Sequence, residues 1–142
     1  MTIRQINKYS RDIHDRINYF LKVLTGKERD VSVEQLNQLF ESKDIHLFLT
    51  FDTDNTVMGM MTLAVNNLST GKRAWIEDVV VAPEHQGKGI GRKMMNFIVD
   101  FAQKEKVNSL MLISNPNRTV ANNLYQSIGF EIREANVYQM KF

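Results

Sequence analysis

The chain has 142 residues, of which 43% are hydrophobic and 24% are charged, and it contains no cysteine. This length suits one globular domain, residues 1–142, around one hydrophobic core. The lack of cysteine excludes disulfides and a cysteine nucleophile, and the net charge of +2 is too weak to indicate a nucleic-acid or membrane partner. The first residues lack the apolar core of a signal peptide and no apolar run reaches the ~20 residues of a membrane helix, so we expect a cytoplasmic protein.

The N-terminal third of the chain predicts a short strand followed by two helices. Residues 2–6 alternate like a strand, and the apolar residues over 10–26 are spaced as on one face of a helix that a glycine ends. A second helix is predicted over 32–43, because Ser32 and Gln35 form a capping box at its start.

The middle of the chain is typical of β-structure. Residues 45–51 and 57–65 are apolar runs on either side of a polar turn, which predicts a β-hairpin. A further strand is predicted over 74–81, where β-branched residues gather before Pro83.

The C-terminal part alternates between helices and strands. The spacing predicts a helix over 90–102, a strand over 107–113, a helix over 119–128 that Gly129 ends, and two short strands within 130–142. The order of elements predicts an α/β domain with a mixed sheet.

The most informative feature is a glycine-rich stretch between a predicted strand and the helix that follows it, Gln86-Gly87-Lys88-Gly89-Ile90-Gly91. Backbone approaches a ligand most closely where no Cβ intervenes, and a helix N-terminus favours an anion such as phosphate. Lys88, Arg92 and Lys93 add positive charge nearby. The spacing excludes both a Walker loop and the dinucleotide fingerprint, because Arg92 stands where each motif needs a glycine.

This stretch resembles the loop that cradles the pyrophosphate of coenzyme A in the GNAT superfamily of acetyl-CoA-dependent N-acetyltransferases. Two further segments are similar to the family's fourth strand with its exit and to its Tyr-x-x-x-Gly-Phe ending: Val79-Val80-Val81-Ala82-Pro83 and Tyr125-Gln126-Ser127-Ile128-Gly129-Phe130. The order of elements agrees as well, so the resemblance covers nearly the whole chain. It implies a GNAT-like fold, with a mixed, mostly antiparallel sheet flanked by helices, and acetyl-CoA as co-substrate without a metal.

The resemblance also implies the residues that bind the cofactor. The loop residues expected on the pyrophosphate are Gln86, Gly87, Lys88, Gly89, Gly91 and Arg92. Backbone groups of Val79 and Val81 would pair with the pantetheine arm as an added strand does. Many family members have an asparagine seven residues before the tyrosine, whereas Arg118 stands there in this chain and Asn117 precedes it. Arg118 is expected on a phosphate, on an anionic group of the acceptor, or in solvent.

Glu77 and Tyr125 are the candidate catalytic residues. An amine must lose its proton before it attacks a thioester, and Glu77 lies on the strand before the loop, where the family often has an acidic base. Asp78 is the alternative, because successive strand side chains point to opposite faces and only one of the two can face the acceptor cleft. Tyr125, matched to the family's tyrosine, would protonate the departing thiolate.

The identity of the acceptor stays open. A primary amine of a small molecule, acetylated by direct attack in a ternary complex, is the favoured reading, since the chain has no cysteine and no Gly-x-Ser-x-Gly motif for an acyl-enzyme. The alternatives are a protein N-terminus or lysine, and a non-catalytic acyl-CoA-binding module. Trp75 is expected either to pack in the core or to wall the acceptor pocket, and a homodimer is left open.

Overall fold

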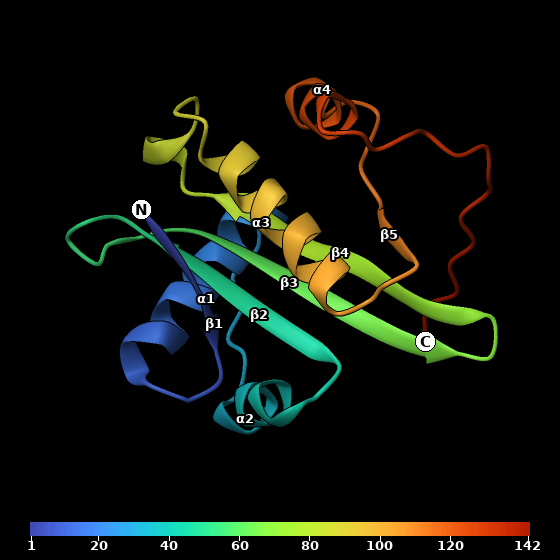
Figure 1. Ribbon diagram of the computed structural model, residues 1–142. Coiled ribbons are helices and arrows are strands. Elements are labelled where there is room, and N and C mark those ends of the chain that lie inside the picture. The colour runs from blue at the N-terminus through green and yellow to red at the C-terminus, as the bar shows by residue number, and fades with distance from the viewer.

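The structure is a computed structural model that describes residues 1–142. A five-stranded sheet forms its middle layer, with α3 on one face and α1 and α2 on the other, while α4 lies beyond the end of β5 (Figure 1). No helix is long and apolar enough to cross a bilayer. The elements are β1 (Thr2–Ile6), α1 (Arg11–Thr25), α2 (Val33–Glu41), β2 (Ile45–Phe51), β3 (Val57–Leu68), β4 (Gly71–Val81), α3 (Ile90–Lys104), β5 (Ser109–Leu112) and α4 (Thr119–Ser127).

The helices begin and end where the sequence predicts. The Ser10 side chain caps α1, and Gly26 ends this helix with a left-handed backbone at φ 69°. In α2, Ser32 and Gln35 form the expected capping box, in which each side chain accepts from the other residue's backbone N–H. These local predictions are confirmed because capping depends on residues that are close together in the sequence.

The sheet has the order β1-β2-β3-β4-β5 and is antiparallel throughout except for the parallel pair β4–β5. The predicted mixed, mostly antiparallel sheet flanked by helices is therefore confirmed. The ladder between β4 and β5 ends at the pair Ile76–Leu112, although β4 continues to Val81. The last residues of β4 thus have an open edge beside the glycine-rich loop.

Two clusters of buried side chains hold the helices on the sheet. Met94 and Ile98 of α3 pack with residues of β3 and β4, and Ile17 and Phe20 of α1 pack with Leu36 on the opposite face. The α3 face is packed closely at Gly59, where a Cβ would lie 2.8 Å from Met94 Sδ and 2.9 Å from Val80 O. Only glycine fits there without movement of the helix or the strand.

A β-bulge interrupts β4 next to the candidate catalytic carboxylates. Thr62 pairs with Glu77 and Met60 pairs with Val80, so two residues of β4 lie opposite one residue of β3. Asp78 in the bulge has a left-handed backbone with φ 54°. Strict alternation, on which the choice between Glu77 and Asp78 rests, fails at the bulge, and both residues are exposed. Which of the two faces the acceptor cleft stays a prediction.

The same bulge changes the direction of the side chains that follow it. Ile76 belongs to the core on the α3 side, whereas Val80, four residues later, belongs to the core on the α1 side. Regular pleating would place both on one face. The bulge thereby turns Val79 and Val81 toward the α3 side, next to the loop.

The prediction of two strands within residues 130–142 is wrong. These residues, the tail, contain no regular secondary structure and run beside β5 outside the sheet (Figure 1). A strand needs a hydrogen-bonded partner as well as apolar alternation, and here the apolar side chains point into solvent. The exposed fraction is 85% for Ile132, 88% for Tyr138 and 77% for Met140.

Candidate active site

The glycine-rich loop has the backbone conformation that its sequence requires. Gly87 and Gly89 have φ of 72° and 74°, and a Cβ on either would meet no other atom within 4 Å. Gly89 stands at the N-cap of α3 and has no side chain that could cap the helix. The backbone N–H groups from Gly87 to Arg92 find no acceptor within the chain. Together with the helix dipole, these free donors favour a negative charge at this position.

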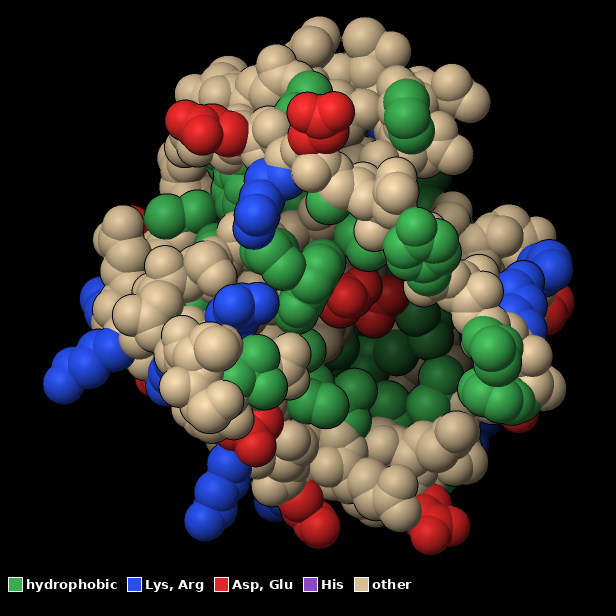
Figure 2. Space-filling view, turned by 90° about the vertical axis from the view of Figure 1, so that its right-hand side faces the viewer, with side chains coloured by type: hydrophobic (Ala, Val, Ile, Leu, Met, Phe, Trp, Pro, Cys, Tyr) green, Lys and Arg blue, Asp and Glu red, His purple; other side chains and the backbone are tan.

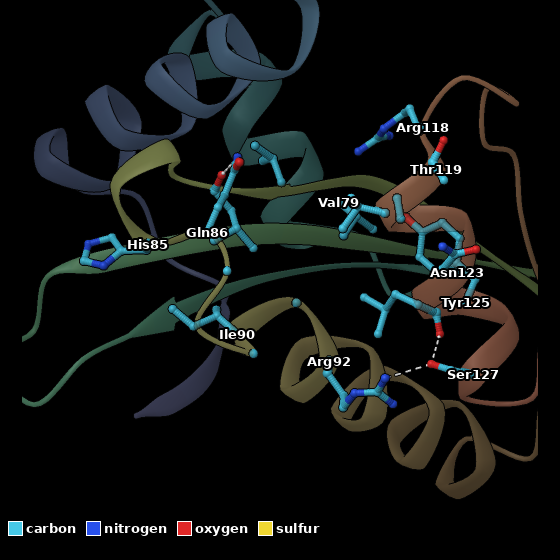
Figure 3. A pocket seen from close by; sticks show the side chains of 18 of the residues that line it. Val79, His85, Gln86, Ile90, Arg92, Arg118, Thr119, Asn123, Tyr125 and Ser127 are labelled. Carbon is cyan, nitrogen blue, oxygen red and sulfur yellow. Dashed lines mark hydrogen bonds between the residues drawn. The ribbon is translucent and has the colours of Figure 1, made fainter.

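A cavity of about 1040 Å³, the loop cavity, lies between the end of β4, the loop, the start of α3 and α4 (Figure 3). Most of the residues that the sequence singles out line it: Val79, Val81, Gln86, Gly87, Gly89, Gly91, Arg92, Asn117, Arg118 and Tyr125. Lys88 and Glu77 are not among its lining residues. Segments from the middle and the end of the chain are thus brought together around one space.

The polar side chains of the loop are tied to the turn before it. Gln86 Nε2 donates to the carbonyl oxygen of Val81 at 2.9 Å, and Lys88 Nζ donates to that of Glu84 at 2.9 Å. The Val81 carbonyl expected to contact pantetheine thus already has one partner. Lys88 is exposed, and its ammonium group lies against the turn that begins at Pro83 rather than in the cavity.

Arg92 joins the two helices on either side of the loop cavity. Its Nη2 donates to Ser127 Oγ at 2.8 Å, and this hydroxyl in turn donates to the carbonyl oxygen of Leu124 at 2.7 Å (Figure 3). One edge of the guanidinium group therefore holds α4 against α3, and the remaining N–H donors of Arg92 have no hydrogen-bond partner within the chain.

Tyr125 is placed on the cavity wall by the packing of α4. Its side chain is 7% exposed, and its ring packs edge-on against Phe130 with centroids 6.2 Å apart. Burial raises the pKa of the phenol above its ordinary value, and the positive charge of Arg118 opposes this rise. Tyr125 is therefore protonated at neutral pH and able to donate a proton into the cavity.

Glu77 and Asp78 lie where β4 continues past the end of β5. Burial raises the pKa of Glu77, and the negative charge of Asp78 raises it further. Burial also raises the pKa of Asp78. A higher pKa makes each carboxylate a better proton acceptor, which is the property that a general base needs.

The structure adds residues that the sequence did not indicate. Val23 and Leu24, at the end of α1, line the loop cavity, although they lie far from the loop in the sequence. In the sequence they are simply apolar positions of an amphipathic helix, so no local signal identifies them. Ser127, which accepts a hydrogen bond from Arg92, is likewise not identified by a local signal, because this contact forms only when α3 and α4 pack side by side.

Solved structures of acetyltransferases share this fold. An aminoglycoside antibiotic 6′-N-acetyltransferase from Acinetobacter baumannii superposes with a TM-score of 0.77 at 18% identity, over 99% of this chain and 97% of that one. The structure of AAC(6')-Iy in complex with the bisubstrate analogue CoA-S-monomethyl-acetylneamine superposes with a TM-score of 0.80 at 16% identity, over 99% and 97% of the two chains. At these identities the likeness establishes the fold.

Relatives of known name are detectable by sequence as well. Mycothiol acetyltransferase of Renibacterium salmoninarum is 31% identical over 109 residues, which are 73% of this chain and 32% of that protein. Streptothricin acetyltransferase of Streptomyces lavendulae is 36% identical over 91 residues, 63% of this chain and 47% of that protein. The chain thus spans between a third and a half of the length of these relatives.

The sequence model of the Acetyltransferase (GNAT) family matches residues 13–130, which include the glycine-rich loop, the open edge of β4 and Tyr125. The match leaves out only β1, the start of α1 and most of the tail. With the loop geometry and the fold in agreement, this chain belongs to the Acetyltransferase (GNAT) family.

Proposed function

We propose that this protein transfers the acetyl group of acetyl-CoA to a primary amine of a small molecule, by direct attack in a ternary complex. The observation that carries the proposal is the loop cavity, where free backbone N–H groups at the start of α3 and the buried phenol of Tyr125 share one space. The relatives support a small acceptor, because the names mycothiol acetyltransferase and streptothricin acetyltransferase each contain a small molecule.

The residues of the loop cavity fit acetyl-CoA. The backbone N–H groups from Gly87 to Arg92 would hold the pyrophosphate, since they have no acceptor of their own and no Cβ at Gly87 or Gly89 obstructs the approach. The open edge of β4 at Val79 would pair with the pantetheine arm, because β5 ends before it. Arg118 and Asn117 line the same cavity and supply a charge and an amide for the remaining polar groups.

The chemistry needs one proton acceptor and one proton donor. Glu77 would take the proton from the acceptor's ammonium group, directly or through water, so that the free amine attacks the thioester carbon. The new C–N bond forms as the C–S bond breaks, and Tyr125 would give its proton to the departing thiolate. The acylated nitrogen would then lose its second proton, through water, to the phenolate of Tyr125, which restores the phenol. The raised pKa values of Glu77 and Tyr125 favour these roles, since the first strengthens a base and the second keeps the donor protonated.

Two measurements on the whole chain test the proposal. Coenzyme A at 100 times its dissociation constant should add about 2.7 kcal/mol of stability in a thermal unfolding experiment. Thiol release from acetyl-CoA should then depend on the addition of small primary amines. The absence of a thermal shift contradicts the assignment of the loop cavity. A shift without release for any amine indicates a binding module, and release with peptides alone indicates a protein acceptor.

A further inference from the structure

A second cavity, of about 660 Å³, lies on the other side of α4 and is called here the tail cavity. Its walls come from β4, β5, α4 and the first residues of the tail. On the face of the molecule that carries β5 and the tail, hydrophobic side chains line a hollow (Figure 2). The loop cavity and the tail cavity therefore flank the same helix.

Three residues of α4 line both cavities: Thr119, Asn123 and Tyr125. Tyr125 is the residue to which the proposed chemistry assigns the thiolate, so the reacting sulfur must lie within its reach. An amine approaching from the tail cavity would meet this point from the side that the cofactor does not occupy. We propose that the tail cavity binds the acceptor and selects a monoamine with an apolar or aromatic body; the assignment rests on the proposed acetyl transfer.

The walls of the tail cavity define the body of the acceptor. Trp75 of β4 and Met111 of β5 are register partners in the parallel ladder, and both line the cavity. Phe130, which packs against Tyr125, lines it from the other side. An indole, a thioether and a phenyl ring favour contact with apolar or aromatic groups over contact with sugars or polyamines.

The charges of the tail cavity limit the number of amines on the acceptor. Glu131 and Arg133 are its charged lining residues, one acidic and one basic, and both are exposed. One carboxylate attracts a single ammonium group, and the neighbouring guanidinium repels a second. The charges of Glu131 and Arg133 cancel, so the lining offers no net negative charge to a polycation, and a monoamine is favoured over spermidine or an aminoglycoside.

The single tryptophan of the chain makes the proposal directly testable. Because Trp75 lines the tail cavity, its fluorescence reports occupancy without any need for turnover. The probes are phenethylamine, hexylamine and spermidine, each titrated in the presence of coenzyme A and then tested as acetyl acceptors. We expect saturable fluorescence changes with the first two amines and at least a tenfold lower KM for phenethylamine than for spermidine.

Two variants of exposed tail residues sharpen the test with little risk to folding. Ile132→Glu adds a negative charge among the residues that line the cavity, at a side chain that is 85% exposed. It should raise the KM for phenethylamine at least fivefold and lower the KM for spermidine. Met140→Glu is the matched control, since Met140 is also exposed but lines neither cavity. It should change neither KM.

The outcomes separate the acceptor assignment from the proposed function. Acetylation of amines without a Trp75 response, or with a preference for spermidine, overturns the assignment and leaves the proposed function standing. Equal effects of the two variants overturn it as well. A Trp75 response to phenethylamine that Ile132→Glu weakens, without thiol release, supports the tail cavity as an amine site and contradicts the transferase.

Discussion

The loop cavity and the tail cavity lie on opposite sides of α4 and are built in different ways. In the loop cavity, the backbone N–H groups of one continuous segment are free, and the positive φ that Gly87 and Gly89 adopt makes this conformation sterically allowed. In the tail cavity, side chains of β4, β5, α4 and an irregular segment form the walls. A site made of backbone groups requires particular residues at fixed spacing, whereas a site made of side chains can be formed by many combinations of residues.

The two kinds of site suit two kinds of ligand. A pyrophosphate presents the same oxygen atoms to every protein, so a fixed loop suffices to hold it. Acceptors vary in shape and charge, so the acceptor site that we propose is formed by side chains such as those of Trp75 and Met111. Tyr125 lines both cavities and therefore lies at the boundary between them.

We expect the largest effect for Tyr125→Phe, which changes the tyrosine that lines both cavities. The variant keeps the ring and its contact with Phe130 but removes the proposed proton donor, so kcat should fall by ~10²–10³-fold with little change in coenzyme A binding or stability. The high-pH limb of the rate profile, which the raised pKa places above that of an ordinary tyrosine, should also disappear. Tyr138→Phe, at an exposed tyrosine, serves as control. Unchanged turnover would contradict the donor role.

Glu77 lines neither cavity, so a variant of Glu77 tests whether a residue outside the two linings takes part in the reaction. Glu77→Gln should lower kcat about 10²-fold at neutral pH by removing the base. Activity of the wild type should fall as the pH drops through the raised pKa of Glu77, because the carboxyl group then becomes protonated. Asp78→Asn removes the charge that raises this pKa and should shift the low-pH limb downward. If the low-pH limb of the rate profile stays at the same pH in both variants, another group is the base.

A matched pair of glycines tests whether the backbone of the loop binds coenzyme A. Gly89 (φ 74°, ψ 7°) and Gly26 (φ 69°, ψ 9°) have nearly the same conformation, but only Gly89 lines the cavity. Alanine at either should cost about 1–2 kcal/mol of unfolding free energy, because left-handed backbone strains an L-residue. Coenzyme A affinity, measured by calorimetry, should fall about tenfold (~1.4 kcal/mol) in Gly89→Ala alone. Equal losses of affinity would mean that strain, rather than loop geometry, is responsible.

The smallest expected effect concerns the support of α4 between the cavities. Ser127→Ala removes the acceptor of the Arg92 hydrogen bond and should lower the unfolding free energy by about 1 kcal/mol in denaturant titrations. Coenzyme A affinity should change less than about twofold, since Arg92 keeps its other donors. Ser69→Ala, at an exposed turn without a side-chain hydrogen bond, should stay within about 0.5 kcal/mol of the wild type. A large loss of affinity would show that Arg92 depends on Ser127 to face the ligand.

The sequence determines the elements whose signals are local. Capping by Ser10, Ser32 and Gln35, and the positive φ at Gly87 and Gly89, depend on neighbours a few residues apart, and the structure agrees with each. The glycine spacing also indicated an anion-binding loop before the fold was known. Such features are predictable because the interactions that stabilise them lie within one turn of helix or one loop.

Only the tertiary structure decides how distant segments meet. The bulge at Asp78 depends on how β4 registers against β3, so alternation in the sequence does not predict the direction of the side chains that follow it, such as Val79. The tail has the apolar alternation of a strand, yet it forms none, because a strand exists only with a hydrogen-bonded partner. The two cavities, and the place of Tyr125 between them, likewise arise from packing across the chain rather than from any single segment.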